Sequence, residues 1–259
     1  MNKILDIITS EYKYITNKKW SLEDVGRHWD STLDYDEINK ETYSYFRRFI
    51  DGYQICNIAD QSYVLDICCR TGNGTDYFSS KGKIKTVVCA DISEEMLKIC
   101  SDRLSGKGID FKTVKFNSYN LPFDKEEFDS ILCFETVEHV AEPDIFIKEL
   151  GRVIKKNGEM ILTTPNILWE PVHILAPILG IHHSEGPHRF IGRHKLHEYI
   201  KDAGFEIQKE KTTILIPNGP KILIKFGDWL EKIIGNWLMD ILGLRRIFIC
   251  KKCKTNKKW

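Results

Sequence analysis

Short apolar runs with the length of buried strands alternate with amphipathic segments from residue 62 onward. The predicted strands cover residues 62–67, 85–91, 111–116, 128–134 and 159–164. Several of these runs are apolar at consecutive positions, which is typical of parallel strands that are buried on both faces. The alternation therefore predicts an α/β fold in which helices cover both faces of a mainly parallel sheet.

Helical patterns fill the intervals between these strands. Residues 143–156 carry apolar side chains at helical spacing, and the following Asn157 and Gly158 predict the end of that helix. A second helix is expected after Ser93, because its hydroxyl suits the N-cap position.

The two ends of the chain differ from this alternating region. Residues 205–216 and 244–252 are predicted strands separated by a mainly helical segment at 221–242, and we expect this late strand pair to close the sheet. Residues 1–60 lack strand signals and are rich in Tyr, Trp and Phe, so an N-terminal helical cap is expected before a main domain at 61–259.

The composition is that of an ordinary globular protein of 259 residues, with 42% hydrophobic and 29% charged residues. A net charge of +1 gives no global electrostatic reason to expect a nucleic-acid partner.

The eight cysteines fit reduced thiols better than a disulfide framework, and the lone CxxC at Cys250 and Cys253 lacks two further zinc ligands. No signal peptide and no run of ~20 apolar residues is evident, so a cytoplasmic protein is expected.

A small-residue loop follows the first predicted strand and leads directly into a helix. Asp66 ends that strand, and the loop reads CCRTGNG. Such a loop lets a ligand approach the backbone closely and presents helix N-terminal N–H groups to an anion. Its only glycines are Gly72 and Gly74, so the dinucleotide fingerprint GxGxxG is absent and a nicotinamide oxidoreductase is disfavoured.

A second acid, Asp91, ends the second predicted strand. A carboxylate at this place can accept hydrogen bonds from both hydroxyls of a ribose. Each acid taken alone is more often a turn residue at the end of a strand. Their placement at successive strand ends favours a ligand that carries an amino group and a ribose.

Five ordered motifs resemble the successive motifs of class I S-adenosylmethionine-dependent methyltransferases, particularly the ubiquinone- and menaquinone-biosynthesis type that acts on small molecules. They span about residues 60–166, and AGFEI at 203–207 extends the match. The motifs are VLDICCRTGNG, VVCADISEEML, NSYNLPFDKEEFDSILC, ETVEHVAEP and LGRVIKKNGEMILTTPN.

The resemblance implies a Rossmann-like, doubly wound fold with a seven-stranded, mainly parallel sheet, an antiparallel last strand pair, and a substrate-covering insert at about 167–192. It implies transfer of a methyl group from S-adenosyl-L-methionine to a small-molecule acceptor, for which lipophilic and glycan-linked molecules are our candidates. A catalytically silent binding module with the same fold is the alternative. The residues implied to hold the cofactor are Asp66, Cys68, Arg70, Gly72, Asp91, Ile92, Asn117, Ser118 and Phe134.

Arg70 departs from the family pattern, which has glycine at this position and at Cys68. A positive φ at Arg70 would carry strain of ~1 kcal/mol. Its side chain could pair with the carboxylate of the cofactor, and the competing interpretation is that it points to solvent.

Three groups of residues are candidates for the acceptor side. If the segment is an α-helix, one of its faces carries Glu135, Glu138 and His139, which would there bind a divalent cation such as magnesium. The alternative is that these acids only stabilise the first turn of a helix and bind no metal. Glu135 and His139 are also candidate catalytic residues.

His188 is the candidate acceptor-side base in a cluster that contains His182, His183, Arg189, His194 and His197, although a structural role is the more frequent one for histidine. The long apolar segment and basic tail at 221–259 are a candidate for peripheral membrane contact or for gripping a lipophilic acceptor. A packed helix pair with a solvated tail is the alternative.

Overall fold

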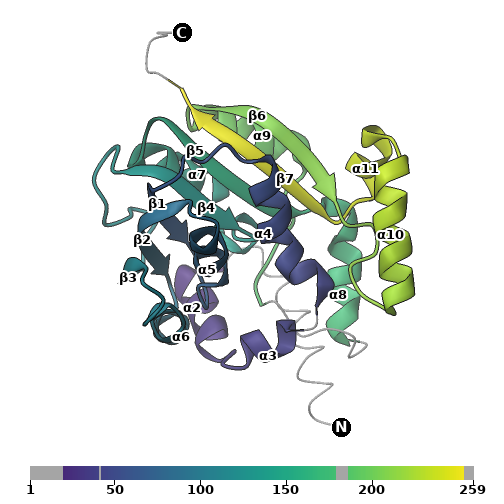
Figure 1. Cartoon of the computed structure of the whole chain (residues 1–259), viewed down its shortest axis with the longest axis horizontal. Coiled ribbons are helices and arrows are strands. Elements are labelled where there is room, and N and C mark those ends of the chain that lie inside the picture. The colour runs from purple at the N-terminus through teal and green to yellow at the C-terminus, as the bar shows by residue number, and fades with distance from the viewer. Residues whose placement is uncertain (1–19, 41, 179–185, 254–259) are drawn as a thin grey trace.

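A seven-stranded sheet runs through the middle of the molecule, as Figure 1 shows for the computed structural model. The structure describes residues 20–40, 42–178 and 186–253. The strand order is β3-β2-β1-β4-β5-β7-β6, with only β7 antiparallel to its neighbours. The strands are β1 (Ser62–Ile67), β2 (Ile84–Asp91), β3 (Asp110–Lys115), β4 (Phe128–Phe134), β5 (Ile154–Pro165), β6 (Phe205–Thr213) and β7 (Arg245–Lys252).

Helices cover both faces of this sheet. Helix α5 contacts both α4 and α6, and all three contact the sheet. Helices α4 and α5 lie in front of the sheet in Figure 1, while α7 and α9 pack together behind it. The Rossmann-like, doubly wound arrangement and the antiparallel last pair confirm the predicted fold class. The helices are α2 (Leu22–Asp30), α3 (Tyr35–Asn39), α4 (Tyr43–Ile55), α5 (Asn73–Ser80), α6 (Glu94–Leu104), α7 (Pro143–Val153), α8 (Glu170–Ile178), α9 (Arg193–Asp202), α10 (Lys221–Ile233) and α11 (Asn236–Leu242), with short 3₁₀ turns η1 (Val137–His139) and η2 (Ile167–Trp169).

Local sequence signals set most element boundaries. The Ser93 hydroxyl accepts a hydrogen bond from the Met96 N–H at 3.1 Å, so it caps α6 as predicted. Helix α7 ends at Val153, so the prediction that it runs to residue 156 is wrong. The reason is pairing in the sheet, because β5 begins at Ile154 opposite Phe128 of β4.

Burial follows the position of each strand in the sheet. The central strands β1 and β4 and residues 158–165 of β5 are almost wholly buried, whereas the edge strand β3 has only exposed and half-buried residues. Helix α4 packs on β5 and β7, and α2 packs on α6. The N-terminal helices therefore pack against the same sheet and its helices, and the boundary at residue 60 stays a prediction.

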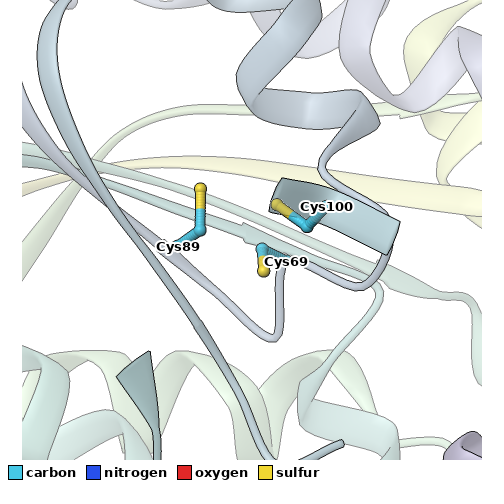
Figure 2. Close-up of side chains that lie close together, drawn as sticks. All are labelled: Cys69, Cys89 and Cys100. Atoms are coloured by element: carbon cyan, nitrogen blue, oxygen red, sulfur yellow. The ribbon is translucent and has the colours of Figure 1, made fainter. Parts of the chain in front are cut away.

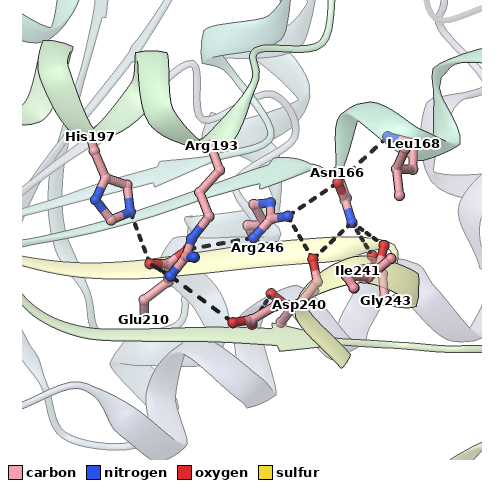
Figure 3. Close-up of polar contacts among 10 residues, drawn as sticks. Asn166, Leu168, Arg193, His197, Glu210, Asp240, Ile241, Gly243 and Arg246 are labelled. Carbon is pink, nitrogen blue, oxygen red and sulfur yellow. Dashed lines mark hydrogen bonds and ion pairs between the residues drawn. The ribbon is translucent and has the colours of Figure 1, made fainter. Parts of the chain in front are cut away.

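A polar network fixes the late strand pair to its helices (Figure 3). Glu210 on β6 accepts hydrogen bonds from Arg193 and His197 of α9 at 2.7–2.9 Å and pairs with Arg246 of β7. Burial acts to raise the pKa of Glu210, but Arg193 and His197 outweigh it and hold that pKa below its ordinary value. The Asn166 amide donates to backbone carbonyls of Ile241 and Gly243, which joins the end of β5 to the end of α11.

Candidate active site

The loop after β1 is held in a tight, partly left-handed conformation. Cys68 and Arg70 have φ of 52° and 49°, and Gly72, the N-cap of α5, has φ of 77°. The Asp66 carboxylate accepts hydrogen bonds from the Thr75 N–H at 3.1 Å and the Thr75 hydroxyl at 2.7 Å. These bonds lock the first turn of α5 against the end of β1.

Asp66 is almost completely buried. Burial raises the pKa of this carboxyl to about 8, the nearby Cys89 thiol adds to the effect, and the hydrogen bonds from Thr75 oppose it. A cationic group that approached Asp66 would favour its ionised form, which suits a ligand that carries an ammonium group.

Asp91 ends β2, the parallel neighbour of β1, two residues beyond Cys89, which is the register partner of Asp66. Its carboxylate accepts hydrogen bonds from the N–H groups of Arg70 at 2.8 Å and Ser93 at 2.9 Å. Each carboxylate oxygen can accept a second hydrogen bond, so the group retains capacity for ligand hydroxyls. Burial raises its pKa, and those backbone donors act in the opposite direction.

A narrow apolar cavity adjoins Asp91, and we call it the Asp91 cavity. Ile92, predicted to pack on a nucleobase, lines it. Asn117 and Ser118, predicted beside it, are exposed and are not among its lining residues, whereas the preceding Phe116 lines it. Its other lining residues are Leu22, Val25, Trp29, Cys68, Arg70, Thr136, His139, Val140 and Phe146.

A second cavity, here called the aromatic cavity, lies between the N-terminal helices, the ends of β4 and β7, and α8. Trp29, Arg70 and His139 line both cavities, so these three side chains form the wall between them. The other lining residues of the aromatic cavity are Tyr35, Asn39, Thr42, Ser44, Tyr45, Arg48, Glu135, Trp169, Val172, His173, Ala176, Pro217, Asn218, Leu244 and Arg245.

The Arg70 side chain lies inside this wall, so the interpretation that it points to solvent is wrong. Its guanidinium donates hydrogen bonds to the backbone carbonyls of Phe134 at 3.1 Å and Glu135 at 2.6 Å. It also lies 4.8 Å from the ring centroid of Trp29 and 5.8 Å from that of Tyr35. The positive φ is confirmed, and these contacts offset its strain.

Phe134 contributes to the site through its backbone. Its ring packs in the core, 5.1 Å from the ring of Phe49, and does not line either cavity. Only its carbonyl oxygen faces the site, where Arg70 binds it. The sequence correctly predicts Phe134 at the end of β4, but it does not indicate whether the ring or the backbone carbonyl faces the site.

Glu135, Glu138 and His139 do not share a helix face, so the predicted metal-binding arrangement is wrong. Glu135 precedes η1 and has φ of 47°, and only residues 137–139 form the short 3₁₀ turn. Glu138 is buried and accepts a hydrogen bond from the Thr164 hydroxyl at 3.1 Å. In the part of the chain that the structure describes, these three side chains are not among the groups with converging ligand atoms.

Glu135 instead forms a buried ion pair. Its carboxylate accepts a hydrogen bond from Arg245 Nε at 3.0 Å. Burial acts to raise the pKa of Glu135, but Arg245 and Arg48 hold that pKa below its ordinary value. A carboxylate held in its ionised form by two guanidiniums is a weak proton acceptor, so Glu135 fits a role in charge balance.

His139 is the histidine of the predicted set that faces the cavities. Its Nδ1 lies 3.0 Å from the Pro187 carbonyl, which can only accept a hydrogen bond. Nδ1 therefore carries the proton, and the basic lone pair of the neutral ring is on Nε2. The ring of the predicted base His188 packs edge-on to that of His139, with ring centroids 6.2 Å apart, and His188 is not among the residues that line either cavity.

The remaining predicted histidines do not gather at the site. His194 is exposed beside Glu198, and His197 belongs to the Glu210 network. His182 and His183 lie outside the described residues. Sequence reasoning missed His173, which lines the aromatic cavity from α8 and stands in the apolar stretch ILWEPVHILAPILG.

Three thiols lie close together under the loop that follows β1 (Figure 2). The sulfur atoms of Cys69, Cys89 and Cys100 lie within 4.8 Å of one another and are buried. A Cβ atom placed on Gly72 would lie 2.6 Å from the Cys100 sulfur, so this packing admits only glycine at residue 72.

Comparisons with known proteins agree with this geometry. Residues 65–162 match a family model described as a methyltransferase domain. The ubiquinone/menaquinone biosynthesis C-methyltransferase UbiE of Burkholderia multivorans is 28% identical over 142 residues, which cover 54% of this chain and 58% of that protein. The match thus spans less than two thirds of the length of that relative.

Solved structures with the same fold are more distant in sequence. The phosphoethanolamine N-methyltransferase 2 of Haemonchus contortus, bound to phosphomonomethylethanolamine and S-adenosylhomocysteine, has a TM-score of 0.65 at 15% identity, covering 92% of this chain and 61% of that one. The [4+2]-cyclase SpnF has a TM-score of 0.63 at 17% identity, covering 90% and 96%. These two similarities show the fold and leave the reaction open.

Proposed function

We propose that this chain, which belongs to the class I S-adenosylmethionine-dependent methyltransferase family, transfers a methyl group from S-adenosyl-L-methionine to a small-molecule acceptor. One observation carries the proposal: the Asp91 cavity and the aromatic cavity share a wall of Trp29, Arg70 and His139. A donor in the Asp91 cavity and an acceptor in the aromatic cavity would lie next to each other at this wall. In-line transfer would take place past its edge, where the acceptor atom and the methyl carbon can come into direct contact with no side chain between them.

The residues present fit the cofactor. Asp91 would accept the ribose hydroxyls, and Ile92 and Phe116 would pack on the adenine in the Asp91 cavity. Asp66 lies beside the loop that the methionine part of the cofactor would cross. Gly74 packs closely on Asp66, since a Cβ atom placed on Gly74 would lie 3.4 Å from the Asp66 carboxylate. When bound, the cofactor supplies an electrophilic methyl group on sulfonium sulfur.

Asn117 and Ser118 stay in the proposal as residues at the outer side of the Asp91 cavity, next to Phe116. Cys68 lines the same cavity, so it would contact the cofactor there. Phe134 takes part through its carbonyl oxygen.

The aromatic cavity would hold the acceptor. Three guanidiniums line it, those of Arg48, Arg70 and Arg245, against the single carboxylate of Glu135. This positive balance favours an acceptor atom that carries or develops negative charge, such as an oxyanion. Trp169 and Val172 at the α8 side would contact an apolar part of the acceptor.

His139 is the proposed base for an acceptor that must lose a proton. Its Nε2 carries the lone pair, and its ring stands in the wall between the cavities. His188 would act through His139, as a positioning residue behind it. Glu135 would hold Arg245 and balance the charge of the cavity.

One observation favours a second candidate, a catalytically silent binding module. Arg70 stands where the family has glycine, and its guanidinium occupies two carbonyls at the wall between the cavities. A binding module would take up the cofactor and leave it unchanged, whereas an enzyme would convert it to S-adenosylhomocysteine in the presence of its acceptor.

Calorimetry tests the cofactor site. We expect S-adenosylhomocysteine to bind the wild-type chain, and Asp91→Ala to abolish that binding because both ribose hydroxyls lose their acceptor. Asp110→Ala is the matched control, since this exposed acid on β3 accepts a hydrogen bond from the Thr86 hydroxyl and lines neither cavity. Retained affinity in Asp91→Ala would overturn the site assignment.

A turnover assay separates the two candidates. Methyl-labelled cofactor is incubated with a panel of quinols, phenols and carboxylic acids, and transfer of the label is measured. Turnover that His139→Ala lowers by at least ~100-fold, with unchanged cofactor affinity, supports the enzyme. Binding without transfer to any acceptor supports the silent module.

A further inference from the structure

Helix α10 carries its apolar side chains toward solvent. Ile222, Phe226, Trp229 and Ile233 follow one another at spacings of four, three and four residues, so they lie in one stripe on the helix. Their exposed fractions are 77%, 49%, 53% and 58%. Trp237 of the next helix, α11, is 69% exposed. These five side chains form what we call the α10 stripe.

The polar side of the same helix faces the protein. Asp228 accepts hydrogen bonds from the Tyr43 hydroxyl at 2.5 Å and from Arg47 at 3.0 Å. Glu231 accepts another from Arg47 at 3.1 Å. A surface helix of a globular protein ordinarily buries its apolar side. Helix α10 therefore turns two acids toward α4, where Tyr43 and Arg47 bind them, while its apolar stripe faces solvent.

The charged residues that α10 exposes are lysines. Lys221, Lys225 and Lys232 are exposed and lie at spacings of four and seven residues, in a row directly beside the apolar stripe. An exposed apolar stripe with tryptophan and an adjacent row of lysines is the pattern of a helix that lies in the interface of an anionic membrane.

The α10 stripe begins four residues after a segment that lines the aromatic cavity. Pro217 and Asn218, just before α10, line that cavity together with Val172 and Ala176 of α8. The indole N–H of Trp169 donates to the Leu242 carbonyl at the end of α11, which ties the two helical segments together. Figure 1 shows α8, α10 and α11 grouped at one end of the molecule.

From these observations we infer that the α10 stripe and its three lysines dock this protein on the surface of an anionic phospholipid bilayer, beside the mouth of the aromatic cavity. Within the described residues, no helix is long and apolar enough to cross a membrane, so the contact is with one leaflet. A second copy of the chain fits this surface less well. A symmetric contact would bring the same lysines of both copies together.

The inference goes beyond the proposed function, since docking needs no methyl transfer. The test uses the full chain and vesicles of phosphatidylcholine with and without phosphatidylserine, and measures binding by co-sedimentation. Each lysine near an anionic surface raises the binding affinity about fivefold, so three lysines should raise the affinity for the phosphatidylserine vesicles by roughly 100-fold.

Two variants probe the surface. Phe226→Ser with Trp229→Ser should lower vesicle binding at least ~10-fold, and Lys221→Glu with Lys225→Glu should remove the preference for phosphatidylserine. The matched control is Leu33→Ser with Ile145→Ser, which makes the same change at exposed apolar residues elsewhere, 61% and 44% exposed, and should bind as wild type. Far-UV circular dichroism and thermal melting verify that each variant folds.

Quenching of tryptophan fluorescence by brominated lipid gives an independent measurement. Trp229 and Trp237 should be quenched, and Trp229→Phe should reduce the effect while vesicle binding persists. Absence of binding to either vesicle, equal loss in the control variant, or concentration-dependent self-association in place of vesicle binding would each overturn the inference. Methyl transfer to soluble acceptors is measured separately, so failure of docking leaves the proposed function standing.

Discussion

Replacing Arg70 with alanine removes a guanidinium that joins the loop after β1 to the end of β4. The variant loses two charge-assisted hydrogen bonds, to the carbonyls of Phe134 and Glu135, and the contact with Trp29. Arg70→Gly makes the same loss but also relieves the positive φ of 49°. The two variants together therefore separate the side-chain contacts from the backbone strain.

The magnitudes decide the expected sign. Two hydrogen bonds from a charged donor contribute about 1.5–3 kcal/mol each, and the contact with Trp29 adds about 0.5–2 kcal/mol. Desolvation of the buried charge and strain of about 1 kcal/mol oppose them. We expect Arg70→Ala to lower the free energy of unfolding by about 3 kcal/mol, and Arg70→Gly by about 1 kcal/mol less.

Urea unfolding followed by circular dichroism and by tryptophan fluorescence measures both values, and coincident transitions justify a two-state treatment. Arg27→Ala is the control, because this arginine is 66% exposed and pairs only at the surface with Glu23 and Asp24, so it should cost less than about 1 kcal/mol. The reasoning is refuted if Arg70→Ala is as stable as wild type, or if glycine is worse than alanine at this position.

Three further predictions concern buried groups. Burial raises the pKa of Asp66 to about 8 in the folded chain, above its ordinary value of 3.8, so the folded chain holds this proton more tightly than the unfolded chain between these two pH values. Stability should therefore fall as pH rises through this window. Relative to Asp66→Asn, wild type should lose up to about 1.4 kcal/mol per pH unit in urea unfolding. Gly72→Ala should lower the free energy of unfolding by at least about 2 kcal/mol. Adding Cys100→Ala should recover part of that loss, since it removes the sulfur atom that lies 2.6 Å from the new Cβ. If nothing is recovered, the whole loss comes from the backbone φ of 77°. Glu210→Gln should lower the free energy of unfolding by about 2–3 kcal/mol in thermal or urea unfolding. The variant should also lose less stability in acid than wild type, because the lowered pKa of Glu210 in the folded chain confers stability that is lost as pH falls. Equal acid sensitivity in both chains would contradict this.

Local patterns in the sequence predicted the sheet and the positions of Asp66 and Asp91. Apolar runs with period-two or continuous burial identify strands, and an acid that directly follows such a run must lie at the end of that strand. The Ser93 cap was predicted for the same reason, because a hydroxyl and the N–H three residues later are neighbours in any helix.

Contacts between distant segments account for what the sequence did not predict. The wall between the cavities combines Trp29 of an N-terminal helix with Arg70 and His139, and no local pattern links these positions. The ExxEH string has helical spacing, yet the φ of 47° at Glu135 breaks that spacing, because its N–H bonds to Thr163 of β5. Tertiary pairing overrode the local preference.

The place of β7 inside the sheet has a consequence for how this chain folds. Strand β7 is the last strand along the sequence, yet it pairs with β5 on one side and β6 on the other, over separations of up to about ninety residues. Until it docks, β5 and β6 are unpaired edges on the nascent chain, which are open to association with other chains. Arg245, which pairs with Glu135, belongs to the same strand, so the aromatic cavity acquires its charge balance only once β7 has docked.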